Sequence, residues 1–78
     1  MTEIKIKGIY RHYNGNLYIV EDVCYHTETE EKMVVYRALY GKYKLWCRPY
    51  DMFLEKVNKN GQKYRFELVE ELEKDFTK

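Results

Sequence analysis

Residues 8–26 read GIYRHYNGNLYIVEDVCYH, and this stretch decides the fold. Asn14-Gly15-Asn16 separates two runs rich in β-formers, Gly8 to Tyr13 and Leu17 to His26. An Asn-Gly pair tolerates the positive φ angles that a primed hairpin turn requires. The stretch therefore predicts two antiparallel strands joined by a tight turn.

The second of these runs contains an irregularity. The alternation that starts at Leu17 breaks at Glu21-Asp22 and resumes at Val23. One extra residue in a strand resets its inward face, which produces a bulge or a sharp bend. Because such bends curl small sheets, the sequence predicts a strongly curved sheet.

The rest of the chain also alternates strands with turns. Met33 to Tyr40 is nearly all apolar or aromatic and predicts a buried strand, in which Arg37 points outward or toward a barrel end. Further expected elements are a strand over Leu45 to Arg48 that Pro49 ends, a helical turn over Tyr50 to Leu54, an extended piece to Val57, a turn over Asn58 to Gly61 and a last strand over Gln62 to Leu68.

The C-terminal residues show a different period. Leu68, Val69, Leu72 and Phe76 fall at helical spacing among acidic residues, which predicts a short amphipathic helix over an open barrel end. The predicted fold class is all-β, or β-rich α+β: a small, partly open SH3-like barrel of about five to six strands with a short C-terminal helix or tail.

The length of 78 residues predicts one domain over residues 1–78, with a core at about residues 8–68 and a C-terminal helix or tail at 69–78. Cys24 and Cys47 are too sparse for a secreted disulfide scaffold, so we expect buried, reduced thiols and a cytoplasmic location. No apolar run is long enough for export or membrane insertion, and no membrane partner is expected.

Charge is segregated along the chain although the formal net charge is only +1. Residues 21–31 hold five acids and no bases, and residues 32–50 hold five bases and no acids. Aromatic residues interleave with the bases, a combination that suits single-stranded nucleic acid. We therefore expect a non-catalytic binding module that contacts nucleic acid or an acidic protein segment, with these candidate residues: Arg11, His12, Tyr13, Arg37, Tyr40, Trp46 and Arg48.

Three alternatives stay open. Trp46 and Tyr36 could both be core residues with the bases facing solvent, because a small fold needs its large rings for burial. The acidic segment could also pair with the basic one and cancel its field. Finally, the function could be structural, with an exposed strand edge binding a peptide or a second copy, as a monomer or weak dimer.

Catalysis and metal binding have less support in this sequence. Cys24, His26, His12 and Cys47 lack the knuckle spacing of a zinc site, so we expect no metal ligands. The sequence has no serine and no Gly-rich phosphate loop, so we expect no catalytic residues and no cofactor. A small enzyme or metal site is the third hypothesis.

Several strings taken together resemble the bacterial domain-of-unknown-function family 1653. They are GIYRHYNG at residues 8–15, HTETEE at 26–31, VYRALY at 35–40, LWCRP at 45–49, MF at 52–53 and GQKYRF at 61–66. The resemblance implies a stand-alone or appended bacterial domain with an SH3-like barrel, and it supplies no established activity or catalytic residue. Cys47, Tyr50 and Tyr64 depart from the pattern, where aliphatic residues and a proline are usual.

Overall fold

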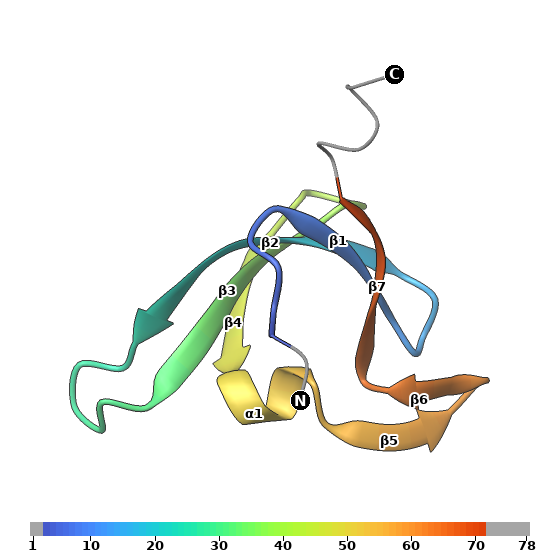
Figure 1. Ribbon diagram of the computed structural model, residues 1–78. Coiled ribbons are helices and arrows are strands. Elements are labelled where there is room, and N and C mark those ends of the chain that lie inside the picture. Colours follow the sequence, from blue (N-terminus) through green and yellow to red (C-terminus); the bar gives the residue numbers. More distant parts are fainter. Residues whose placement is uncertain (1–2, 72–78) are drawn as a thin grey trace.

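The computed structural model describes residues 3–71, and strands dominate this part of the chain. The elements in chain order are β1 (Gly8–His12), β2 (Leu17–Tyr25), β3 (Lys32–Ala38), β4 (Leu45–Pro49), α1 (Tyr50–Phe53), β5 (Lys56–Lys59), β6 (Gln62–Tyr64) and β7 (Phe66–Glu71). Five strands form an antiparallel sheet in the order β4-β3-β2-β1-β7, and β5 pairs with β6. Figure 1 shows the larger sheet arching over α1 and β5.

The first hairpin and the bend are confirmed. β1 pairs with β2 from Ile9 opposite Ile19 to Arg11 opposite Leu17, and Gly15 between the strands has φ +101°. The register of β2 on β3 shifts between Val20 and Asp22, where the sequence predicted an extra residue. The sheet therefore curls at the predicted place, and its inner face becomes concave.

Alternation along the strands decides which side chains fill the concave face. Val34, Tyr36 and Ala38 of β3 are buried, whereas Arg37 between them faces outward as predicted. The core then receives one aromatic residue from each of two later elements, Phe53 of α1 and Phe66 of β7. The buried residues are Ile4, Tyr10, Tyr18, Val20, Val34, Tyr36, Ala38, Phe53 and Phe66.

Aromatic rings hold the layers of the core together. Phe53 and Phe66 are stacked, with centroids 4.0 Å apart and planes 3° apart. Tyr10 meets Phe53 edge-on at 5.2 Å, and Tyr36 meets both phenylalanines at 5.3 Å. Such edge-on and stacked pairs add to the free energy gained by burial alone. The helical turn α1 is thus fixed to the sheet through one fully buried ring.

The predicted last strand, Gln62 to Leu68, is divided in the structure. Arg65 interrupts it: its amide donates to the Glu55 carbonyl, and its own carbonyl accepts from the Tyr13 amide. The chain therefore changes partner at Arg65, from β5 to β1. This corner raises the strand total in residues 3–71 to seven rather than five or six. These strands do not close into a barrel, and the likeness to SH3 barrels stays a prediction.

The last strand contains Leu68 as predicted but continues to Glu71, so the helix or tail expected from residue 69 is wrong for residues 69–71. Leu68 and Val69 belong to β7, which pairs along β1 as far as Gly8 opposite Glu71. The free edge of β1 offers this segment hydrogen-bond partners, and pairing there overrides the helical spacing of the apolar residues. The remainder of the expected helix, residues 72–78, lies outside the described residues.

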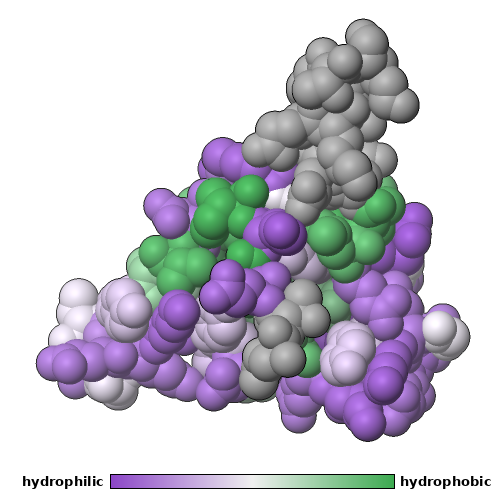
Figure 2. All heavy atoms as spheres, in the orientation of Figure 1, coloured by the Kyte–Doolittle hydropathy of each residue, from purple (hydrophilic) through white to green (hydrophobic). Residues whose placement is uncertain are grey.

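The expected burial of the two thiols is also wrong. Cys24 and Cys47 are free and exposed. Cys24 pairs with Met33 and Cys47 with Val35, so both side chains lie on the outer face of the sheet, opposite to the core. Figure 2 shows that other apolar side chains also reach the surface, in patches separated by hydrophilic ones. In residues 3–71 no helix is long and apolar enough to span a membrane.

Candidate functional site

A small hollow lies at the end of the β3–β4 hairpin. Tyr40 and Trp46 line it together with Ala38, Gly41, Lys42 and Lys44, and its volume is about 220 Å³. The hairpin loop is held by hydrogen bonds from the Ala38 amide to the Lys44 carbonyl and from the Tyr43 amide to the Tyr40 carbonyl. The hollow thus has a fixed backbone, two aromatic rings and two lysines.

The rings at this hollow are exposed. Tyr40 is 42% exposed and Trp46 is 47% exposed, whereas Tyr36, which pairs with Trp46 across the strands, is only 4% exposed. β4 is the edge strand of the sheet, so no further strand covers Trp46. The structure therefore separates two residues that the sequence could place together in the core: Tyr36 is buried, whereas Trp46 is half exposed with the Lys44 ammonium 6.0 Å from its ring centre.

Behind the hollow lies a pair of tyrosine hydroxyls. The hydroxyls of Tyr18 and Tyr40 are 2.8 Å apart and share one hydrogen bond. Burial raises the pKa of the Tyr18 hydroxyl, and the bond to Tyr40 raises it further. Tyr18 also meets Tyr36 and Phe66 edge-on. The exposed ring of Tyr40 is thus anchored to the core and cannot rotate freely.

Arg48 of β4 reaches across the concave face from the same side. Its Nε donates to the Tyr36 hydroxyl at 3.3 Å, and its Cζ lies 5.8 Å from the centre of the Phe66 ring. Register places Arg48 opposite Val34, two residues along β4 from Trp46, so both side chains lie on the inner face. Arg48 therefore extends the site from the hollow toward β1 and β7.

His12 of β1 lies against the same phenylalanine. The two ring centroids are 4.8 Å apart, with a 77° angle between their planes. The Asn14 amide donates to His12 Nδ1 at 3.1 Å. Burial holds the pKa of His12 below its usual 6.5, and the charge of Arg48 lowers it further. His12 and Arg48 therefore meet at one ring, that of Phe66.

Tyr13 forms the border of the site next to His12. Its ring stacks obliquely on His12 at 4.2 Å, and Lys59 lies over it at 5.3 Å. Asn60 donates to the Tyr13 carbonyl at 3.0 Å, which ties the β5–β6 hairpin to the β1–β2 turn. The site therefore combines segments from four parts of the chain.

The predicted cancellation of charge affects only part of the basic segment. Glu21 accepts from Arg37 at 3.1 Å and from Lys7 at 2.7 Å, and these bonds lower the pKa of Glu21, the one from Lys7 more than the one from Arg37. Within residues 3–71 no ion pair is formed by Lys42, Lys44, Lys59 or Arg48. These four cations are therefore not neutralised by any acid of the described residues.

The structure brings together five of the seven candidate residues and leaves two elsewhere. Tyr40 and Trp46 line the hollow, His12 and Arg48 lie against Phe66, and Tyr13 stacks on His12. Tyr18 contacts both groups through Tyr40 and His12, and we call these five candidate residues together the aromatic site. Arg11 and Arg37 point to the outer face, as their opposite neighbours Leu17 and Ile19 do. Tyr18, Lys59 and Phe66 also contact the site but were not among the residues predicted from the sequence. Of the three, only Tyr18 could have been identified, because its alternation with Leu17 and Ile19 predicts an inward side chain.

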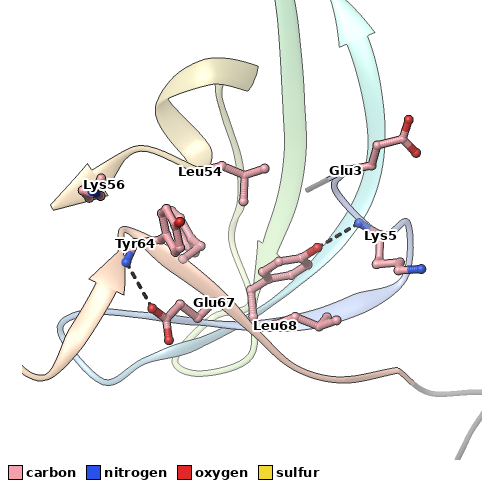
Figure 3. Close-up of a pocket in the computed structure, with 9 residues that line it drawn as sticks. Glu3, Lys5, Leu54, Lys56, Tyr64, Glu67 and Leu68 are labelled. Atoms are coloured by element: carbon pink, nitrogen blue, oxygen red, sulfur yellow. Dashed lines mark hydrogen bonds between the residues drawn. The ribbon is translucent and has the colours of Figure 1, made fainter. Parts of the chain in front are cut away.

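A larger hollow of about 540 Å³ lies elsewhere, between β7, β5, α1 and the first described residues. Leu54, Tyr64 and Leu68 line it in Figure 3, where Glu3 and Lys5 point away from the other labelled residues. Two lysines and two glutamates surround it, so it favours neither sign of charge. Among residues 3–71 no group of three or more His, Cys, Asp or Glu side chains could hold a metal ion.

Comparison with known proteins agrees with the resemblance in the sequence. A solved structure of a protein from Bordetella bronchiseptica, described as belonging to DUF1653, is 29% identical and has a TM-score of 0.77. The match covers 88% of this chain and 91% of that one. No curated protein matches the sequence. The family model for DUF1653, a protein of unknown function, matches residues 8–68, and the chain therefore belongs to this family.

Proposed function

We propose that this protein is a non-catalytic binding module for single-stranded nucleic acid. The observation that carries the proposal is the hollow between the exposed rings of Tyr40 and Trp46, with Lys42 and Lys44 at its rim. At about 220 Å³ the hollow is smaller than the usual site for a drug-sized ligand, roughly 300–1,000 Å³, and suits a single flat ring.

Each part of the aromatic site then has a physical role. A base stacks against Tyr40 or Trp46, and every base has a π-face, so this contact is tolerant of sequence. Lys42, Lys44 and Arg48 contribute the positive charge that backbone phosphates require. The Tyr18–Tyr40 hydroxyl bond orients one ring before binding, which lowers the entropy cost of ordering it.

The test is an NMR titration of the ¹⁵N-labelled protein with short single-stranded RNA and DNA at low and high salt. We expect shifts at Tyr40, Lys44 and Trp46 that weaken with salt, because about three phosphate contacts on a single strand give a log–log slope near −2. Absence of salt-sensitive shifts at these residues would sink the proposal. Shifts produced by an acidic peptide but by no oligonucleotide would assign the site to an acidic protein segment instead.

A matched pair of variants isolates the stacking contact. Trp46→Ala removes an exposed ring at the hollow, and Tyr25→Ala removes one that is 64% exposed at the far end of β2. Stacking is worth about 1–3 kcal/mol per base, so Trp46→Ala should weaken binding by about 5- to 150-fold. Tyr25→Ala should change it by less than about twofold. Equal effects would show that exposed rings bind without any specific site.

A second candidate function rests on the free edge of β4. The Ala38 amide donates to the Lys44 carbonyl, so along β4 it is Trp46 and Arg48 whose backbone groups bond to β3. The backbone groups of Leu45 and Cys47, which alternate with them, face away from the sheet. Unpaired edges accept an added strand from a peptide or a second copy. Sedimentation over a wide concentration range tests self-association: a dimer that Cys47→Pro abolishes would favour this function, since proline removes an edge donor.

A further inference from the structure

The inner face holds a second group of donors beside the hollow. The two terminal guanidinium nitrogens of Arg48 make no hydrogen bond within residues 3–71, because only its Nε is engaged, by the Tyr36 hydroxyl. Arginine forks bind two oxygens of one phosphate or carboxylate group. Arg48 is half-buried, which strengthens such a contact relative to one in open water.

His12 supplies a further donor that packs on the same phenylalanine ring as Arg48. Its Nδ1 accepts a hydrogen bond from the Asn14 amide, so in the neutral ring the proton lies on Nε2. Both side chains rest on the Phe66 ring, which is 1% exposed and immobilised by its stack on Phe53. The positions of the two donors are therefore fixed by the core and not by mobile loops.

No described carboxylate balances these two groups. The charged and titratable groups around His12 are Arg48 of β4, Arg65 before β7, and Tyr13 and Tyr18. Arg65 is already paired with Glu55 at 2.7 Å. An anion placed between Arg48 and His12 would meet donors from two strands and no competing acid, and a protonated His12 would add a second charge.

We propose that Arg48 and His12 form a specific seat for one phosphate group, which in the bound strand is a backbone phosphodiester next to the base held at Tyr40 and Trp46. This inference rests on the proposed function for the source of the phosphate, but the seat itself is defined by the two side chains. The terminal guanidinium nitrogens of Arg48 hold the two unesterified oxygens of the phosphodiester, and Nε2 of His12 donates to one of these same oxygens.

The first test uses inorganic phosphate alone, with chloride at matched ionic strength as the reference. We expect phosphate to shift the side-chain resonances of Arg48 and the ring resonances of His12, and to raise the pKa of His12, because an adjacent anion favours the charged imidazole. Shifts spread evenly over the exposed lysines, with His12 unchanged, would overturn the seat. This measurement uses the unmodified chain and does not depend on any variant folding.

The second test compares variants in oligonucleotide binding. Arg48→Gln should weaken binding by about tenfold or more and reduce the salt slope by about 0.7, whereas Arg11→Gln, at an exposed position on the outer face, should change affinity less than about twofold. Arg48→Lys keeps the charge but loses the fork, so it should recover only part of the affinity. Amide spectra of each variant establish that it is folded.

The two proposals can fail separately. If phosphate occupies the seat but no oligonucleotide binds, the seat stands and the nucleic-acid function is wrong. If oligonucleotides bind and Arg48→Gln behaves like Arg11→Gln, the function stands and the seat is wrong.

Discussion

Phe53 offers a direct test of how the core is built. Its side chain is 0% exposed, stacks on Phe66 and meets Tyr10 and Tyr36 edge-on. Replacement by alanine should cost about 3–5 kcal/mol, the usual range for a buried phenylalanine. A chain of 78 residues has about 4–12 kcal/mol of stability in total, so that variant risks complete unfolding.

Phe53→Leu is the better perturbation because it keeps most of the apolar volume. A near volume-conserving swap costs less than about 1.5 kcal/mol, and each lost ring pair adds about 0.5–1.5 kcal/mol. With three overlapping ring contacts taken at the low end, we expect a loss of about 2–3 kcal/mol in the free energy of unfolding. For a domain of this size that lowers Tm by roughly 8–24 °C.

Thermal and urea unfolding followed by circular dichroism would measure this loss. The matched control is Met52→Ala in the same helical turn, where the side chain is 41% exposed and the expected change is within about 0.5 kcal/mol. A Phe53→Leu variant within 0.5 kcal/mol of the unmodified protein would refute the packing described here. So would a Met52→Ala variant that loses as much stability as Phe53→Leu.

Three further predictions test separate features. Gly8→Ala should cost about 1–3 kcal/mol in urea unfolding, because an added Cβ would lie 3.0 Å from Leu68 Cδ1 and 3.1 Å from the Lys5 carbonyl oxygen; a cost below 0.5 kcal/mol would contradict this crowding. The folded pKa of His12 is below its unfolded value of 6.5, so the unfolded state binds more protons and the free energy of unfolding should fall as pH drops through 6.5. His12→Asn should flatten this fall in stability. If the variant showed the same fall, another group would be its cause. Cys24 and Cys47 should both react with a thiol reagent in the folded protein, and protection of either until unfolding would contradict their exposure.

The sequence predicted best where a local rule fixes the backbone. The Asn14–Asn16 turn needs positive φ, and Gly15 supplies it at +101°. A strand must change face when an extra residue enters it, and Glu21-Asp22 marked that place before the register was known. Pro49 ended β4, and the next residues formed the expected helical turn. In each case the physical cause lies within a few neighbouring residues.

Prediction from the sequence failed where the position of a residue depends on a strand far away in the chain. The apolar period after Leu68 indicated a helix, but residues 69–71 extend the predicted strand by pairing along the free edge of β1. Cys24 and Cys47 were expected inside because thiols are often buried, yet their register turns them to the outer face. Arg11 and Arg37 failed to join the candidate site for the same reason. Register depends on pairing across the sheet, which one segment of sequence does not reveal.

The question of self-neutralisation illustrates how register also strengthens the functional argument. In the sequence, five acids next to five bases could cancel any field. Alternation along β2 instead puts the Glu21 carboxylate on the outer face, where Arg37 and Lys7 neutralise it. Alternation along β3 and β4 sends Arg48 and Trp46 to the inner face, and the curl of the sheet brings Arg48 over Phe66 beside His12. Alternation across β2, β3 and β4 thus puts the ion pairs of Glu21 and the unpaired Arg48 on opposite faces of the sheet.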